Sequence, residues 1–131
     1  MEVVCGSLDS WASGDGEAAR AAYDPHAVLI RPVIEARILH GPPAIEAANE
    51  AWRRSSEDFR MEVEEAVDAG DDVVVTVRQH GVGRDTGAQV ELGSHGVFSL
   101  RNSKIIRAEF FESKSEALEA AGVRESPSRI D

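Results

Sequence analysis

The chain has 131 residues, enough for one domain with a substantial core but too few for two. Its formal net charge of −10, from 14 basic and 24 acidic residues, argues against nucleic acid or an anionic membrane as a partner, because both attract cationic surfaces. No segment approaches the roughly 20 apolar residues of a membrane span, and the first residues lack the basic and apolar pattern of a signal peptide.

Two short helices are expected at the start of the chain. Val4, Leu8 and Trp11 recur at the spacing i, i+4, i+7, which is typical of one helix face. Asp15 can then cap a second short helix over residues 16–23, since aspartate accepts hydrogen bonds from the free N–H groups of a first turn.

The segment HAVLIRPVIEARILHG, residues 26–41, is typical of an edge strand that runs into a turn. Its apolar run ends at Arg31, a permanent cation placed directly before a proline. Arg31 is either a solvated strand end or a group that points into a site, and the local pattern leaves both open.

The longest helix is predicted over residues 41–59, with Ile45, Ala48 and Trp52 as its buried stripe. Prolines in its first turn are tolerated because those amides have no partner within the helix.

After this helix the apolar period changes to two. Strands are predicted over residues 60–69, 72–83, 88–100 and 104–112. Their short connectors are rich in turn-forming residues, so neighbouring strands should be antiparallel. A short helix over 115–122 follows, and we expect residues 123–131 to be a disordered tail.

This order of elements predicts an α+β fold. Three helices should pack on the concave side of a curved, mostly antiparallel sheet. Helices against a strongly curved sheet make a cone, with room for a small ligand between the two layers.

Several segments in this order resemble a known family. They are SWASGDGEAARAAYDPHAVL, HGPPAIEAANEAW, VDAGDDVVVTVRQHGVGRDTG, GVFSLRNSKIIRAEFF and SEALEAAG. The set resembles the nuclear transport factor 2-like superfamily, most closely its branch of SnoaL-like polyketide cyclases and ketosteroid isomerases. The resemblance implies a cone-shaped, cystatin-like roll, with a single SnoaL-like domain over residues 1–122 and a pocket that opens near the end of the first strand.

The resemblance also implies a homodimer through the outer face of the sheet. Period two along the last strand puts Ile105 and Phe111 on the face opposite to Ile106 and Phe110. Both faces would then carry large apolar side chains, and one of them would need a partner.

The acids of the related enzymes have no obvious counterpart in this sequence. The isomerases' proton-shuttling carboxylate corresponds to Arg31, which cannot act as a base. The isomerases' second acid, on the penultimate strand, falls on Gly96 if the apolar face points inward, with His95 pointing away. A bulge at Gly93 or Gly96 would instead turn His95 inward. The cyclases' aspartate maps near Phe110, so we do not expect a steroid isomerase of the usual carboxylate type.

Three residues are candidates for catalysis. Arg31 could stabilise an oxyanion, with His80 or His95 moving a proton. The alternatives are that Arg31 pairs with Glu35 or Glu109 at the rim, and that His80 lies on the surface or in a dimer interface.

Aromatic residues are candidates for the wall of the pocket or for plain core, two roles that overlap in this fold. They are Trp11, Tyr23, Trp52, Phe59, Phe98 and Phe110.

We expect no metal and no cofactor. The four histidines lack metal-binding spacing, and no glycine pattern is typical of a phosphate site. The single Cys5 excludes an intrachain disulfide and favours a cytoplasmic location.

Two hypotheses follow. The first is a SnoaL-like enzyme of cyclase, isomerase or dehydratase type, acting without a cofactor on a compact cyclic or polyketide-like carbonyl substrate. The second is a non-catalytic module of the same fold that binds a small ligand or forms dimers.

Overall fold

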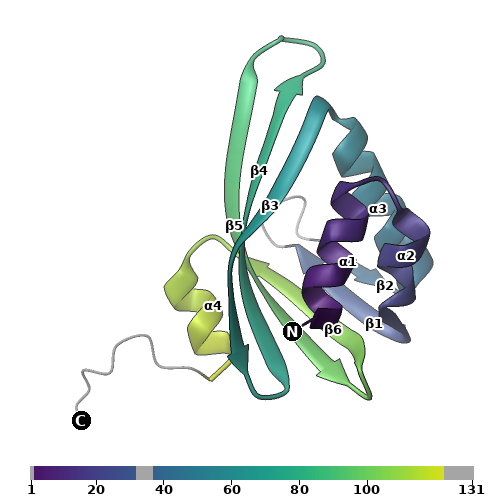
Figure 1. Cartoon of the computed structure of the whole chain (residues 1–131), viewed down its shortest axis with the longest axis vertical. Coiled ribbons are helices and arrows are strands. Elements are labelled where there is room, and N and C mark those ends of the chain that lie inside the picture. Colours follow the sequence, from purple (N-terminus) through teal and green to yellow (C-terminus); the bar gives the residue numbers. More distant parts are fainter. Residues whose placement is uncertain (1, 32–36, 123–131) are drawn as a thin grey trace.

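The structure is a computed structural model that describes residues 2–31 and 37–122. The predicted tail, residues 123–131, and Glu35 lie outside this part of the chain. In chain order the elements are α1 (Glu2–Ala12), α2 (Gly16–Ala21), β1 (Tyr23–Arg31), β2 (Arg37–His40), α3 (Pro42–Arg54), β3 (Ser56–Ala69), β4 (Asp72–Gly83), β5 (Gln89–Arg101), β6 (Lys104–Phe111) and α4 (Lys114–Ala120) (Figure 1).

The six strands form one mixed sheet with the order β2-β1-β6-β5-β4-β3. All neighbouring pairs are antiparallel except β1 and β6, which run parallel. Figure 1 shows α1, α2 and α3 on one side of this sheet and α4 on the other. The predicted α+β fold, with three helices on one side of a mostly antiparallel sheet, is confirmed.

The local signals explain most element ends. The Asp15 side chain accepts a hydrogen bond from the Ala18 N–H at 3.1 Å and caps α2, as predicted. Ser113 caps α4 in the same way through Glu116 N–H, also at 3.1 Å. Gly14 ends the α1 turn with a φ of 89°, a conformation that favours glycine.

Two boundaries differ from the prediction. The helix expected over residues 41–59 ends at Arg54, because the chain from Ser56 onward pairs with β4 instead, beginning at Ser56–Gly83. The strand predicted at the edge of the sheet is β1, which begins at Tyr23 and lies between β2 and β6, so the predicted edge position was wrong. The edge strand is β2, which pairs antiparallel with β1 from Val28–His40 to Arg31–Arg37. The end of α3 and the start of β1, where Tyr23 pairs with Ile105 of β6, depend on pairing between distant segments, which outweighs local propensity.

The inner face of the sheet carries the main core. Val73, Val75 and Val77 of β4 are buried there, and Ile45 of α3 packs against the same cluster. Of the stripe predicted on α3, Ile45 is buried, whereas Ala48 and Trp52 are half-buried.

The last strand does not keep the simple alternation that its sequence indicates. The pairing of β5 with β6 shifts between Ser99 and Leu100, as it does at a β-bulge. Ile105 therefore lies in the inner core together with Phe110, and the prediction that these two residues lie on opposite faces was wrong. Phe111 packs with a second cluster on the outer face, as the alternation predicted.

The outer face is partly covered by the chain itself. Val74 and Val97 pack there against Ala117 and Leu118 of α4. The homodimer through this face remains a prediction. No helix in the described part of the chain is long and apolar enough to cross a membrane.

Candidate functional site

A cavity of about 360 Å³ lies between the inner face of the sheet and helices α1 and α3. Its volume is within the range typical of sites for small organic ligands. The lining residues are Leu8, Trp11, Tyr23, Leu29, Arg31, Asn49, Trp52, Met61, Val77, Gln79, Leu92, Gly93, Ser94, Phe98, Phe110, Phe111 and Glu112. Most of this wall is apolar, so its few polar groups stand out.

Five of the six predicted aromatic residues line this cavity. Phe59 does not line the cavity, but its ring packs against that of Trp11, with 5.4 Å between the two ring centroids. Phe98 and Phe110 meet edge to face, with ring centroids 5.7 Å apart, at the bottom of the sheet wall.

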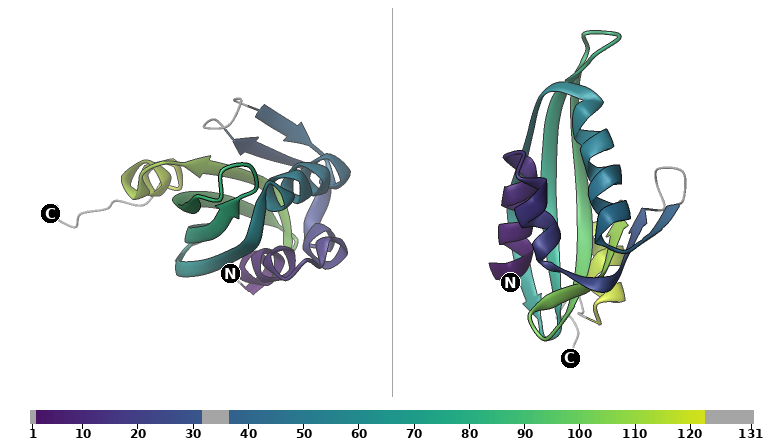
Figure 2. Two further views of the ribbon diagram at one scale, coloured as in Figure 1. Left: turned by 90° about the horizontal axis from the view of Figure 1, so that it is seen from above. Right: turned by 90° about the vertical axis from the view of Figure 1, so that its right-hand side faces the viewer.

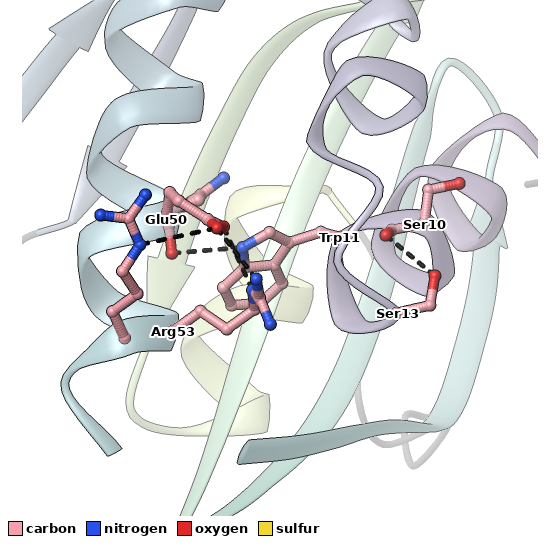
Figure 3. A network of polar contacts seen from close by, with 7 residues as sticks. Ser10, Trp11, Ser13, Glu50 and Arg53 are labelled. Carbon is pink, nitrogen blue, oxygen red and sulfur yellow. Dashed lines mark hydrogen bonds and ion pairs between the residues drawn. The ribbon is translucent and has the colours of Figure 1, made fainter. Parts of the chain in front are cut away.

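Trp11 connects helices α1 and α3, which cover the cavity. Its indole N–H donates to the backbone carbonyl of Asn49 on α3 at 3.2 Å, and Figure 3 shows the side chain reaching from α1 toward α3. On the same helix Arg53 pairs with Glu50 at 2.9 Å (Figure 3). The Trp11 hydrogen bond links α1 to α3 across the cavity, whereas the Arg53–Glu50 pair lies within α3.

Arg31 lies at the end of β1 on the cavity wall. Its guanidinium donates to the Asn49 side-chain oxygen at 3.3 Å, and the residue is half-buried. Of the two rim partners expected from the sequence, Glu35 lies outside the described residues, and Glu109 pairs with Arg107 at 2.7 Å.

Tyr23 contributes a hydroxyl group to the same wall. Burial raises the pKa of this phenol well above its ordinary value, because the anionic form would lose its hydration. The hydroxyl therefore stays neutral and can donate a hydrogen bond at any ordinary pH.

The two histidines lie away from the cavity, on the outer face. His95 Nδ1 is 2.9 Å from the Thr76 hydroxyl, and His80 Nδ1 is 3.4 Å from a Glu91 oxygen. The pairing of β4 with β5 runs without a shift from Asp72–Ser99 to Val82–Gln89, so no bulge turns His95 inward. The structure does not bring either histidine together with Arg31.

Gly96 occupies the inward position instead, and the space beside it is filled. A Cβ atom at this residue would lie 2.9 Å from the Phe110 ring and 3.0 Å from the Phe98 ring. The edge-to-face aromatic pair thus takes the volume that a side-chain acid would need.

Glu112 is a cavity residue that the sequence reasoning missed. It directly follows β6 and lines the cavity together with Phe110 and Phe111. The cyclases' acid was expected near Phe110. Glu112 lies two residues further along the chain, which is one period of strand alternation. Within residues 2–31 and 37–122, no hydrogen bond or ion pair engages the Glu112 carboxylate.

The described residues contain no group of three or more His, Cys, Asp or Glu side chains arranged to hold a metal ion.

The fold is similar to several solved structures. A protein with a ketosteroid isomerase-like fold from Catenulispora acidiphila, in complex with trimethylamine, has a TM-score of 0.77 and 15% identity, over 99% of this chain and 98% of its own. A candidate SnoaL-like polyketide cyclase from Jannaschia sp. CCS1 has a TM-score of 0.75 and 21% identity, over 92% and 88%. TerC co-crystallised with polyporic acid has a TM-score of 0.74 and 17% identity, over 92% and 96%.

These identities are low, so the solved structures bear on the fold alone. No curated protein sequence matches the chain. The family model of the SnoaL-like domain, however, matches residues 6–108, a range that runs from α1 into β6 and holds most of the cavity wall but not α4 or the cavity residues Phe110, Phe111 and Glu112. The chain therefore belongs to the SnoaL-like domain family.

Proposed function

We propose that the protein is a small-molecule enzyme of cyclase, isomerase or dehydratase type that acts on a compact cyclic or polyketide-like carbonyl compound. The observation that carries this proposal is that a cation, Arg31, and a carboxylate, Glu112, line one apolar cavity. Such a pair can stabilise an oxyanion and move a proton in the same site.

The chemistry begins with the carboxylate. Glu112 accepts the proton of a C–H bond next to a substrate carbonyl, and the electron pair of that bond moves to the carbonyl oxygen to form an enolate. Arg31 and the neutral Tyr23 hydroxyl donate hydrogen bonds to this oxygen. The enolate carbon then attacks a second carbonyl carbon of the substrate, whose π bond breaks as its oxygen takes up the proton from Glu112, or the enolate takes that proton back at another carbon. His80 and His95, the proton carriers expected from the sequence, have no part in this scheme because they lie on the outer face.

The similar proteins support an acidic or carbonyl ligand. One is a candidate polyketide cyclase, and another was co-crystallised with polyporic acid, an acid that an arginine could pair with. The trimethylamine complex of a third shows that the fold also accepts amines. In this chain Arg31 disfavours a cationic ligand in the cavity.

Deuterium exchange tests the proposal. The α-protons of 2-tetralone, a compact cyclic ketone, should exchange faster in D₂O with the protein than without it, as followed by NMR. Glu112→Gln should slow the catalysed exchange by about 100-fold or more, which is typical for loss of a general base. Glu119→Gln, at an exposed position of α4, is the matched control and should leave the rate unchanged. Equal rates for wild type and Glu112→Gln would refute the role of Glu112.

Arg31 should matter more for binding than for folding. Arg31→Ala removes a charge-assisted partner worth about 1.5–3 kcal/mol, or roughly ten- to a hundredfold in affinity for an acidic ligand. Arg31→Lys should recover only part of this affinity, because an ammonium lacks the two-pronged geometry. Thermal shift with aromatic acids and phenols measures both effects. A mutant that melts far below wild type, with no difference in ligand stabilisation, would make Arg31 a structural rim residue.

A non-catalytic binding module is the second candidate. It is favoured by the filled space at Gly96 and by the outward histidines, which leave the cavity with few acid–base groups. Ligand stabilisation without any acceleration of exchange in the wild type would support this function.

A further inference from the structure

A single amide side chain interrupts the apolar part of the wall formed by β3, β4 and β5. Gln79 lines the cavity, and its partners in the neighbouring strands are Met61 and Leu92, which line it too. An amide that leaves water costs free energy unless its polar atoms find partners. A polar residue at such a position is therefore more informative than the apolar residues around it.

Trp52 determines which end of this amide is available. The indole N–H can only donate, so the Gln79 atom that it contacts at 2.6 Å is the oxygen. The amide nitrogen keeps its two N–H groups, and no hydrogen bond within residues 2–31 and 37–122 uses them. Gln79 is thus held in one orientation, as a hydrogen-bond donor on the cavity wall.

The Asn49 amide is oriented in the same way at the other end of the site. The guanidinium of Arg31 can only donate, so the Asn49 oxygen is its acceptor and the Asn49 amide nitrogen remains a donor. Tyr23 is a neutral hydroxyl on the same wall. Apart from the Ser94 hydroxyl and the Glu112 carboxylate, the polar side chains of the cavity are therefore donors, which suits a ligand with several acceptor oxygens.

The two donor groups lie on separate strands. Arg31 is on β1 and Gln79 is on β4, with β6 and β5 between them. Three strand spacings correspond to roughly 14 Å between the backbones along the sheet, which side-chain length and sheet curvature shorten. A ligand that meets both donors needs oxygens at opposite ends of a rigid frame, such as a fused ring system.

We propose that Gln79 is a specificity-determining residue, which donates a hydrogen bond to a carbonyl oxygen at the end of the ligand remote from Arg31. The site then selects fused-ring compounds with an acidic or enolic oxygen at one end and a carbonyl oxygen at the other. The proposal rests on the proposed function in that it takes the same cavity as the ligand site.

Three naphthoic acids test this inference by titration calorimetry. They are 2-naphthoic acid, its 6-acetyl derivative, which adds a remote acceptor, and its 6-amino derivative, which adds a remote donor. The wild type should bind the acetyl compound about tenfold more tightly than the parent acid, since one hydrogen bond of this kind contributes about that factor. Gln79→Leu should abolish this gain, so that the variant binds the acetyl compound no more tightly than the parent acid. Gln89→Leu, at an exposed position at the start of β5, is the control and should behave as wild type.

Gln79→Glu gives the sharpest result, because it preserves shape and still accepts from Trp52 while replacing the donor with an acceptor. This variant should prefer the amino compound to the acetyl compound, a reversal that a merely structural role for Gln79 would not produce. If the wild type binds all three acids equally and Arg31→Ala weakens all three, the role of Gln79 is refuted and the Arg31 anchor stands. If the wild type binds none of them, both the inference and the acidic ligand class of the proposed function are refuted.

Discussion

Both the inner and the outer face of the sheet contain buried valines of β4, but the two faces differ in how their polar side chains are arranged. On the outer face the polar groups engage one another: Arg78 pairs with Glu64 at 2.8 Å and lies 3.7 Å from Glu91, which also meets His80. On the inner face the polar groups are few and lie among apolar neighbours: Gln79 pairs with Met61 and Leu92 in the adjacent strands and accepts one hydrogen bond, from Trp52 at 2.6 Å.

This difference indicates where a ligand binds. Polar groups that satisfy one another gain little from a new partner, whereas a remaining donor in an apolar cavity, such as the amide nitrogen of Gln79, gains a full hydrogen bond when a ligand supplies the acceptor. A histidine count alone would have favoured the outer face, which carries both His80 and His95.

The largest effect on stability is expected where α4 packs on the outer face of the sheet. Leu118 is 5% exposed, and Leu118→Ala should lower the free energy of unfolding by about 2–4 kcal/mol, because it leaves a cavity under a short helix. Leu92 is 40% exposed at the cavity rim, so Leu92→Ala should cost about 1 kcal/mol or less. Urea denaturation measures both, and equal losses would show that α4 does not hold the outer cluster.

The next effect concerns two glycines of β5. Gly96→Ala should destabilise the fold by about 1–3 kcal/mol, because the new methyl group meets the rings of Phe98 and Phe110. Gly93→Ala is the matched control on the same strand, since its nearest contact is a Val77 backbone oxygen at 3.9 Å. A tolerated Gly96→Ala would show that the inner face has room at this position for a side-chain acid.

A smaller, pH-dependent effect is expected from His95. Burial, and then the nearby Lys114, lower the pKa of this imidazole below its ordinary value of 6.5, while Glu65 and Glu64 oppose the shift. The unfolded chain therefore takes up the proton first, and stability is lost as the pH falls from 6.5 toward the lower folded pKa. Thermal melts between pH 7 and pH 5 should show a steeper loss for wild type than for His95→Gln. Parallel curves would contradict this.

The smallest effect on folding is expected in the ionic group of the outer face, since exposed pairs contribute little to stability. Arg78→Glu would nevertheless place a carboxylate beside Glu64 and Glu91. If the predicted homodimer forms through this face, light scattering should show a dimer for wild type and a monomer for the variant. A monomeric wild type at micromolar concentration would count against the homodimer.

Much of the fold could be predicted from local patterns. The alternation over residues 72–83 matches β4 from end to end, and the Asp15 cap lies where the sequence places it. The end of α3 and the shift in β6 could not be predicted in this way, because both depend on hydrogen bonds to strands that are distant in the sequence. Figure 2 shows the β4–β5 hairpin extending past the end of α3, an arrangement for which the period-two pattern carries no signal.

The sequence by itself determined the α+β class, the order of the elements apart from β2, and the aromatic residues from which the cavity is built. Periodicity and capping act within a few residues, so these features can be derived from local spacing. Only the tertiary structure decided which face each polar group occupies. Valines alternate on both faces of β4, and the side that is enclosed depends on where α1, α3 and α4 pack. That packing turned His80 and His95 outward and placed Arg31, Gln79 and Glu112 around one cavity.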